Sequence, residues 1–230
     1  MSLKLAVPSK GRLMEKTFDW FATRGIVMQR SGSDREYAAR VDGADLQLLL
    51  LSASEIPREL QAGRIHLGVT GSDLVRERIP LWEQVVAELA PMGFGFADLV
   101  IAVPKLWVDV ETLDDLDVVA ADFREAHGFR LRIATKYHRL VREFLQDSGV
   151  ADYQLVDSQG ATEGTVKHQT AEAIADITST GETLRANHLK ILSDGLVHRS
   201  QATLFKSRAA PWDDDIRAAL HTLQDKLELL

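Results

Sequence analysis

The sequence contains no cysteine among its 230 residues. Disulfide bonds, a thiolate nucleophile and a cysteine-bound metal are therefore excluded. The seven histidines show neither the His-x-Glu nor the His-x-x-x-His spacing, so no zinc site is predicted. Any chemistry must come from carboxylates, hydroxyls, amides and cations.

The sequence also lacks an excess of basic residues and any long apolar run. The formal net charge is −7, which gives no overall basic field for nucleic acid. The longest apolar run, around Leu48–Leu51, is far too short to cross a bilayer. The segment Met1–Leu13 lacks the apolar centre of a signal peptide. We therefore expect a cytoplasmic protein that contacts neither membrane nor nucleic acid, in which an anionic substrate would need a locally basic pocket.

Short apolar runs alternate with helical patterns along nearly the whole chain. The expected strands are Leu3–Pro8, Leu46–Leu51, His66–Thr70, Leu99–Pro104, Leu131–Thr135, Tyr153–Asp157, Ala173–Ile177 and Gln201–Lys206. The expected helices are Gly11–Arg24, Ser54–Ala62, Asp73–Arg78, Thr112–His127, Tyr137–Asp147 and Asp213–Leu229. This alternation predicts an α/β fold with largely parallel sheets. The two glycines of Pro91–Gly95 suit either a hinge between two lobes or a simple loop.

The most specific motif is the segment Asp176–Thr183, which follows a predicted buried strand and opens a short helix. Backbone N–H groups at a helix start are unpaired and attract anions. A glycine lets the backbone approach a ligand closely. This pattern is typical of a phosphate loop, although a plain Ser/Thr helix cap has the same composition. The residues that provide hydroxyls and the glycine are Thr178, Ser179, Thr180, Gly181 and Thr183.

Three further loops follow predicted strands. Ser9–Arg12 places Lys10 and Arg12 around Gly11, where ligands commonly bind in α/β sheets and where a solvated helix start is the plainer interpretation. Gly68–Asp73 and Gly160–Gly164 are glycine-containing turns, and ordinary turn chemistry explains either one alone. Together, the loops are harder to attribute to turn chemistry only.

Six segments together resemble the ATP phosphoribosyltransferase family. They occur in the family's order, and DITSTGETLRAN is the most specific part. The segments are AVPSKGRL (6–13), GVTGSDLVRE (68–77), GFGFADLVIAVP (93–104), RIATKY (132–137), GATEG (160–164) and DITSTGETLRANHLKILSDG (176–195).

The resemblance implies two α/β lobes of the type II periplasmic-binding-protein kind, with the active site in the cleft between them. Lobe I would comprise residues 1–93 plus about 196–230, and lobe II about 94–195, without a C-terminal regulatory domain. The implied reaction opens histidine biosynthesis. N1 of ATP attacks the anomeric carbon of phosphoribosyl pyrophosphate (PRPP), and magnesium pyrophosphate leaves.

The resemblance also implies site residues, none of them a covalent catalyst. Those expected to bind PRPP are Glu163, Asp176, Thr178, Ser179, Thr180, Gly181, Glu182 and Thr183. Those expected to bind ATP or pyrophosphate are Lys10, Gly11, Arg12, Thr70, Gly71 and Asp73. Mg²⁺ would enter on the substrate phosphates, and no protein ligand for it is predicted.

Some positions depart from the family's common pattern. Ser52 stands where many members have arginine, which puts one polyphosphate contact in doubt. Another cation would then cover that side: Arg30, Arg35 or Arg40. The remaining departures are Glu55, His138, Gln169 and Glu172.

The length of the chain resembles the short form of the family, whose members work with a regulatory subunit similar to histidyl-tRNA synthetase. A homodimer or larger hetero-oligomer is expected. The predicted last helix carries an apolar stripe that fits packing on its own lobe or on a partner, formed by Ile216, Leu220, Leu223 and Leu227. The alternative functions are a non-catalytic solute-binding protein of the same fold and a different phosphoribosyltransferase.

Overall fold

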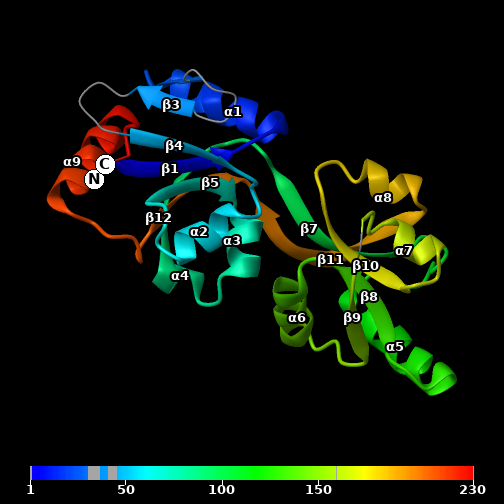
Figure 1. Cartoon of the computed structure of the whole chain (residues 1–230). Helices are drawn as coiled ribbons and strands as arrows, with labels where there is room; N and C mark the ends of the chain where they lie inside the picture. Colours follow the sequence, from blue (N-terminus) through cyan, green and yellow to red (C-terminus); the bar gives the residue numbers. More distant parts are fainter. Residues whose placement is uncertain (1, 31–36, 41–45, 159, 230) are drawn as a thin grey trace. The chain divides into compact units, whose positions relative to one another are not determined.

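The computed structural model describes residues 2–30, 37–40, 46–158 and 160–229 (Figure 1). The chain divides into two compact units. Unit 1 comprises Met1–Gly95 and Gln201–Leu230, and unit 2 comprises Phe96–Ser200. The first crossing between units therefore follows directly after the predicted hinge stretch. The predicted cleft concerns the placement of the two units and stays a prediction.

Unit 1 is built on a seven-stranded mixed sheet with the order β2-β3-β4-β1-β5-β12-β6. β1 runs parallel to β4 and β5, whereas β12 runs antiparallel to β5 and β6. The carboxyl ends of β1, β4 and β5 therefore share one edge of the sheet, where ligands of α/β proteins commonly bind. The strands are β1 (Leu3–Pro8), β2 (Val27–Arg30), β3 (Tyr37–Arg40), β4 (Leu46–Leu51), β5 (Leu67–Gly71), β6 (Val86–Pro91) and β12 (Ala202–Ser207).

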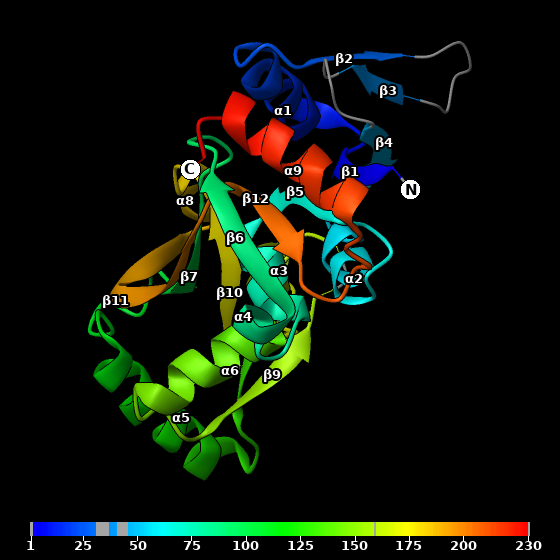
Figure 2. The same cartoon turned by 90° about the vertical axis from the view of Figure 1, so that its left-hand side faces the viewer.

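Helices cover both faces of this sheet. α1 (Gly11–Ala22) and α9 (Asp214–Lys226) share one apolar core with β1, and Figure 2 shows the two helices side by side. The apolar stripe of α9 is buried in that core, so it packs on its own unit. A second core lies under α2 (Ile56–Gln61) and α3 (Ser72–Arg78), and α4 (Trp82–Val85) follows α3.

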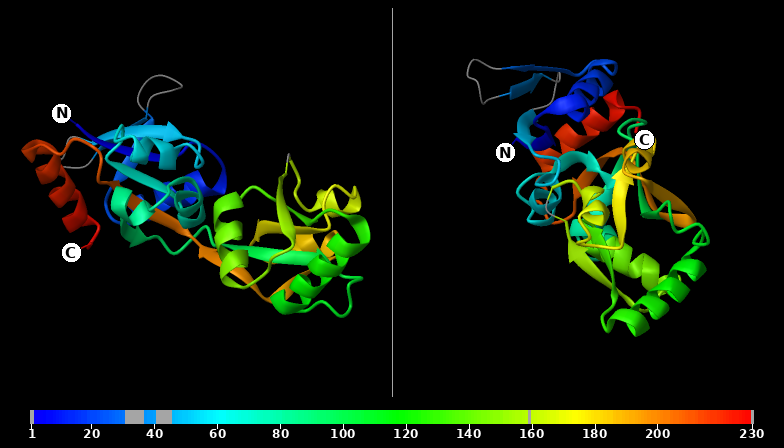
Figure 3. Two further views of the ribbon diagram at one scale, coloured as in Figure 1. Left: turned by 90° about the horizontal axis from the view of Figure 1, so that it is seen from below. Right: turned by 90° about the vertical axis from the view of Figure 1, so that its right-hand side faces the viewer.

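Unit 2 holds a five-stranded mixed sheet with the order β11-β7-β10-β8-β9. β8 runs parallel to β9 and β10, and β7 is antiparallel to β10 and β11. α5 contacts β8 and β11 and is visible in both views of Figure 3. The elements are β7 (Ala97–Pro104), α5 (Leu113–His127), β8 (Leu131–Thr135), α6 (His138–Asp147), β9 (Tyr153–Asp157), α7 (Gly164–Lys167), β10 (Ala173–Thr178), α8 (Glu182–Ala186) and β11 (Leu189–Ser200).

The predicted elements all occur, within a few residues at their ends. No prediction covered β2, β3, β6, β11 or the short helices α4 and α7. In β11, Ser193-Asp194-Gly195 has the composition of a turn. The structure accommodates it as an irregularity in the pairing of β11 with β7 between Ile191 and Leu196. None of the helices in the described part of the chain is long and apolar enough to cross a membrane.

His66 makes the stability of unit 1 depend on pH. Its ring is buried, with Nδ1 accepting from the Lys4 N–H at 3.0 Å and Nε2 lying 3.1 Å from the Pro211 carbonyl. These contacts fix the neutral tautomer, and burial lowers the pKa of His66 from its ordinary 6.5. Below about pH 6.5, His66 therefore takes up a proton in the unfolded chain, whereas in the folded chain it stays neutral down to its lower pKa.

We therefore expect the free energy of unfolding to fall as the pH drops from 6.5 toward the lower pKa of the folded state. The slope from this group is at most about 1.4 kcal/mol per pH unit. Urea titrations of the parent and of His66→Asn between pH 7.5 and 5.5 measure it. His221→Gln, at an exposed histidine, is the control. An equal pH slope in the parent and in His66→Asn would contradict the assignment.

Candidate functional site

A cavity of about 400 Å³ lies in unit 2 at the carboxyl end of β10. Six of the eight residues predicted to bind PRPP line it. Of the other two, Gly181 lines a separate cavity of about 350 Å³, and Glu182 is exposed and lines neither. The residues around the first cavity are Ala97, Glu163, Asp176, Ile177, Thr178, Ser179, Thr180, Thr183 and Leu184.

The loop after β10 forms more internal hydrogen bonds than the sequence suggested. The Gly181 N–H donates to Thr178 Oγ1 at 2.8 Å, and the Glu182 N–H donates to Thr180 Oγ1 at 3.3 Å. Two amides that we expected to be unpaired are thus satisfied within the loop, because Ser and Thr hydroxyls readily form such local turns. Each hydroxyl that accepts in this way still has its own proton to donate to an anion.

Arg185 supports the loop from behind. Its Nη2 donates to the Thr180 carbonyl at 2.9 Å, so a positive charge lies one helical turn after the glycine. Ser179 differs from its neighbours because its hydroxyl donates to the Phe96 carbonyl at 3.2 Å. Arg185 is absent from the predicted site, although a cation directly after a phosphate-loop pattern was a signal for it.

Asp176 is the half-buried acid of the cavity. Burial raises the pKa of its carboxyl group, and the negative charge of Glu163 adds to this effect. The Ile177 N–H, the Thr162 hydroxyl and the Lys136 charge oppose it by favouring the ionised form. The effect of burial outweighs these contacts, so Asp176 binds a proton more readily than an exposed aspartate does.

Glu163 lies between glycines in the turn before α7, as the sequence indicated. The turn is anchored at both ends. Lys136 Nζ donates to the Gly160 carbonyl at 2.6 Å, and the buried hydroxyls of Thr162 and Ser158 are 2.7 Å apart. Lys136 and Thr162 lay within segments that were recognised as motifs, yet neither was singled out.

The basic motif lies in unit 1 at the carboxyl end of β1. Lys10 precedes α1 in an extended conformation, and Gly11 follows with φ of +72°. The side chains of Lys10 and Arg12 are exposed and make no hydrogen bond or ion pair with the residues that the structure describes. Both cations are thus accessible to a ligand.

The second loop of unit 1 is more enclosed. Thr70 is fully buried, and its hydroxyl donates to the Ala53 carbonyl at 2.7 Å. Asp73 is buried in the first turn of α3, and Gly71 stands at the start of this helix. Because β5 runs parallel to β1, this loop shares the sheet edge with Lys10, although its side chains point mainly into the protein.

Ser52, where the resemblance led us to expect arginine, is part of a small polar network. Glu55 Oε2 accepts from the Ser52 N–H at 3.0 Å and from its hydroxyl at 2.7 Å, and these bonds lower the pKa of Glu55. The cations expected to compensate were Arg30, Arg35 and Arg40. The structure describes only the backbone of Arg30 and Arg40, and Arg35 lies outside the described residues. At the start of α6, His138 Nε2 lies 3.4 Å from Asp157 Oδ1.

Gln169, where the resemblance led us to expect glycine, occupies a backbone conformation that suits glycine. The φ angle of Gln169 is +55°. Glu172, another departure from the expected pattern, accepts three hydrogen bonds from Arg132. A left-handed non-glycine residue costs about 1–2 kcal/mol.

We expect Gln169→Gly to raise the free energy of unfolding by about 1 kcal/mol, since it removes this strain. Chemical denaturation measures the change. The exposed neighbour His168, with φ of −88°, gives the control His168→Gly, which should lower stability instead. A loss of stability in both variants would show that Gln169 is unstrained.

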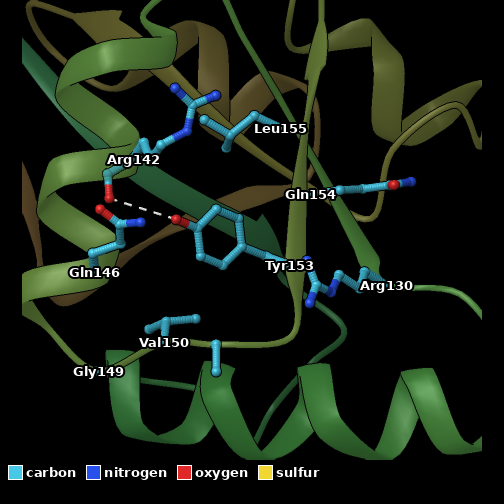
Figure 4. Close-up of a pocket in the computed structure, with 9 residues that line it drawn as sticks. Arg130, Arg142, Gln146, Gly149, Val150, Tyr153, Gln154 and Leu155 are labelled. Atoms are coloured by element: carbon cyan, nitrogen blue, oxygen red, sulfur yellow. Dashed lines mark hydrogen bonds between the residues drawn. The ribbon is translucent and has the colours of Figure 1, made fainter.

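A larger cavity of about 540 Å³ lies elsewhere in unit 2, at the amino ends of β8 and β9 (Figure 4). Arg142 and Gln146 enter it from α6, opposite Tyr153, whose hydroxyl lies 3.5 Å from the Arg142 carbonyl. None of the predicted site residues lines it. Within the described ranges, no group of three or more His, Asp or Glu residues is placed to hold a metal ion.

Comparison with known proteins identifies the family. The profile described as ATP phosphoribosyltransferase matches residues 52–228, more than half of the chain. An ATP phosphoribosyltransferase of Cereibacter sphaeroides is 74% identical over 215 residues, which cover 93% of this chain and 91% of that protein.

Two solved structures show the fold. A chain of the ATP phosphoribosyl transferase (HisG:HisZ) complex from Thermotoga maritima aligns with a TM-score of 0.69 and 23% identity, covering 98% of both chains. A mutant of ArgBP from T. maritima aligns with a TM-score of 0.51 and 15% identity, covering 97% of this chain and 88% of that one. The predicted binding-protein-like fold is confirmed. The chain belongs to the ATP phosphoribosyltransferase family, the enzymes of the first step of histidine biosynthesis.

Proposed function

We propose that the cavity at the end of β10 binds the phosphoribosyl half of PRPP. The observation that carries this assignment is the convergence of hydroxyls from Thr178, Thr180 and Thr183 with the carboxylates of Asp176 and Glu163 around one cavity. Hydroxyl protons suit a 5′-phosphate, and Arg185 adds a positive charge behind the loop, whereas carboxylates accept hydrogen bonds from ribose hydroxyls.

In the proposed reaction the lone pair of adenine N1 forms a bond to the anomeric carbon of PRPP. The bond from that carbon to the pyrophosphate oxygen breaks, and its electron pair leaves with pyrophosphate. The other product is N1-(5-phosphoribosyl)-ATP. No side chain acts as a covalent nucleophile. Orientation of two bound reactants alone can contribute roughly 7–11 kcal/mol to lowering the barrier.

The polyphosphates require cations. Lys10 and Arg12 provide two accessible charges at the sheet edge of unit 1, and Arg can bind phosphate through two parallel hydrogen bonds. Mg²⁺ enters as part of the substrate, because this ion prefers oxygen ligands and is commonly bound through substrate phosphates. When bound, it neutralises charge that develops on the leaving pyrophosphate.

The protein is further proposed to act in the cytoplasm with a regulatory subunit resembling histidyl-tRNA synthetase. Support comes from the fold shared with a chain whose solved structure is described as a HisG:HisZ complex. An effector bound to a separate chain must favour one functional state of the complex. We expect histidine to inhibit turnover only after the partner is added. Strong inhibition of the isolated chain would place the effector site within it.

The assay for the reaction is direct. Purified protein is mixed with ATP, PRPP and Mg²⁺, and the absorbance of N1-substituted adenine is followed. Adenine, guanine and orotate replace ATP in parallel reactions, which tests for a different phosphoribosyltransferase. Binding of PRPP without any product would favour a solute-binding role, whereas product with ATP alone supports the proposed reaction.

A further inference from the structure

Asp176 is anchored by a short chain of buried hydroxyl groups. Thr162 is fully buried, and Ser158 is 5% exposed. The Thr162 hydroxyl bonds to the Asp176 carboxylate, and its oxygen lies 2.7 Å from Ser158 Oγ. Three segments thus meet at one threonine: the end of β9, the turn that carries Glu163, and β10.

The direction of these hydrogen bonds follows from counting protons. An ionised carboxylate only accepts, so Thr162 must donate its one hydroxyl proton to Asp176. Thr162 Oγ1 then accepts from Ser158, which becomes the donor of the 2.7 Å bond. The chain therefore runs in one sense, from Ser158 through Thr162 to Asp176, and each bond polarises the next.

We propose that Thr162 is a positioning residue for the phosphoribosyl transfer: its buried hydroxyl fixes the Asp176 carboxylate and, through the adjacent backbone, holds Glu163 on the same cavity. This inference rests on the proposed function of that cavity. Asp176 is also held by the Ile177 N–H at 2.9 Å. With two donors placed by the protein, its remaining lone pairs are oriented for the ribose rather than free to rotate.

A role in packing alone makes a different prediction. Thr162 also contributes its carbonyl, which accepts from the Thr165 hydroxyl at 2.7 Å and holds the start of α7. Loss of the Thr165 hydroxyl would loosen the same turn without touching Asp176. Thr165→Val is therefore the matched control for Thr162→Val.

The experiment measures kcat and the KM values for PRPP and ATP in the full-length protein, with thermal unfolding of each variant. Thr162→Val keeps the side-chain shape and removes the donor. We expect kcat/KM for PRPP to fall about 10-fold, the size of a lost hydrogen bond to a charged group. The KM for ATP should stay within about threefold. Thr162→Ser, which keeps the hydroxyl, should restore most of the loss, and Thr165→Val should cost little activity.

A double-mutant cycle with Asp176→Asn separates the possible failures. If Thr162 acts through Asp176, Thr162→Val should have little further effect in the Asp176→Asn background. Full additivity, or equal activity losses in Thr162→Val and Thr165→Val, would overturn the positioning role. An Asp176→Asn variant with unchanged PRPP kinetics would instead show that the proposed function of this cavity is wrong.

Discussion

Replacing Gly181 with valine should weaken PRPP binding about 100-fold, or about 2.7 kcal/mol, while the protein stays folded. Gly181 has φ of +73°, a conformation that a β-branched residue adopts only with strain. A side chain there would also lie 2.9 Å from Arg185 Nη1. Moving Arg185 away would break its bond to the Thr180 carbonyl. The loop would thus lose its glycine turn and the cation behind it together.

Calorimetric titration with PRPP measures the effect of Gly181→Val. Gly128 supplies the control, because its φ is +76° and a Cβ there would meet no atom within 4 Å. Gly128→Val should lower thermal stability through similar backbone strain and leave the affinity for PRPP intact. Unchanged affinity in Gly181→Val would remove this loop from the phosphate site.

Removing either cation of the basic motif should have a comparable effect on polyphosphate binding. Lys10→Ala and Arg12→Ala each delete a charge-assisted contact worth about 1.5–3 kcal/mol, which is roughly 10- to 150-fold in affinity. Neither side chain contacts a described residue through a hydrogen bond or ion pair, so their removal should leave stability nearly unchanged.

Lys16→Ala is the matched control, since Lys16 is an exposed lysine on the same helix and its loss changes the net charge equally. Calorimetry with ATP and with PRPP, at one fixed salt concentration, compares the three variants. Equal affinities in all of them would make the motif a solvated helix start.

Sequence reasoning worked where one local rule decides the outcome. Apolar runs identified the central strands of both sheets but missed β2, β3, β6 and β11. The sequence of the loop at Thr178–Thr183 indicated where hydroxyls gather. It failed where contacts distant in sequence decide. Thr162 and Asp176 are joined only because β9 and β10 flank β8, and no spacing reveals that. The strand β11 was missed because its Ser-Asp-Gly turn composition is overruled by pairing with β7.

Sequence reasoning was also limited in predicting which hydrogen-bond donors of the loop at Thr178–Thr183 are free. Sequence alone suggested amides free for an anion, whereas the folded loop satisfies two of them with its own hydroxyls. The sequence tells which donor and acceptor groups are present, but only the folded backbone decides which of them already form hydrogen bonds within the protein. Arg185 illustrates this point, since its position behind Thr180 depends on the glycine turn.

The place of β12 has a consequence for how the protein is made. In the sheet of unit 1, β12 lies between β5 and β6, yet it follows all of unit 2 in the chain. During synthesis β5 and β6 must therefore wait, with unpaired backbone edges, until residues 96–200 have been translated. Such edges invite pairing with other chains. Unit 2, being continuous, is free to fold first, and its folding shortens the loop that β12 must close. The order of translation thus makes the ribosome-bound intermediate, rather than the finished enzyme, the form most exposed to aggregation.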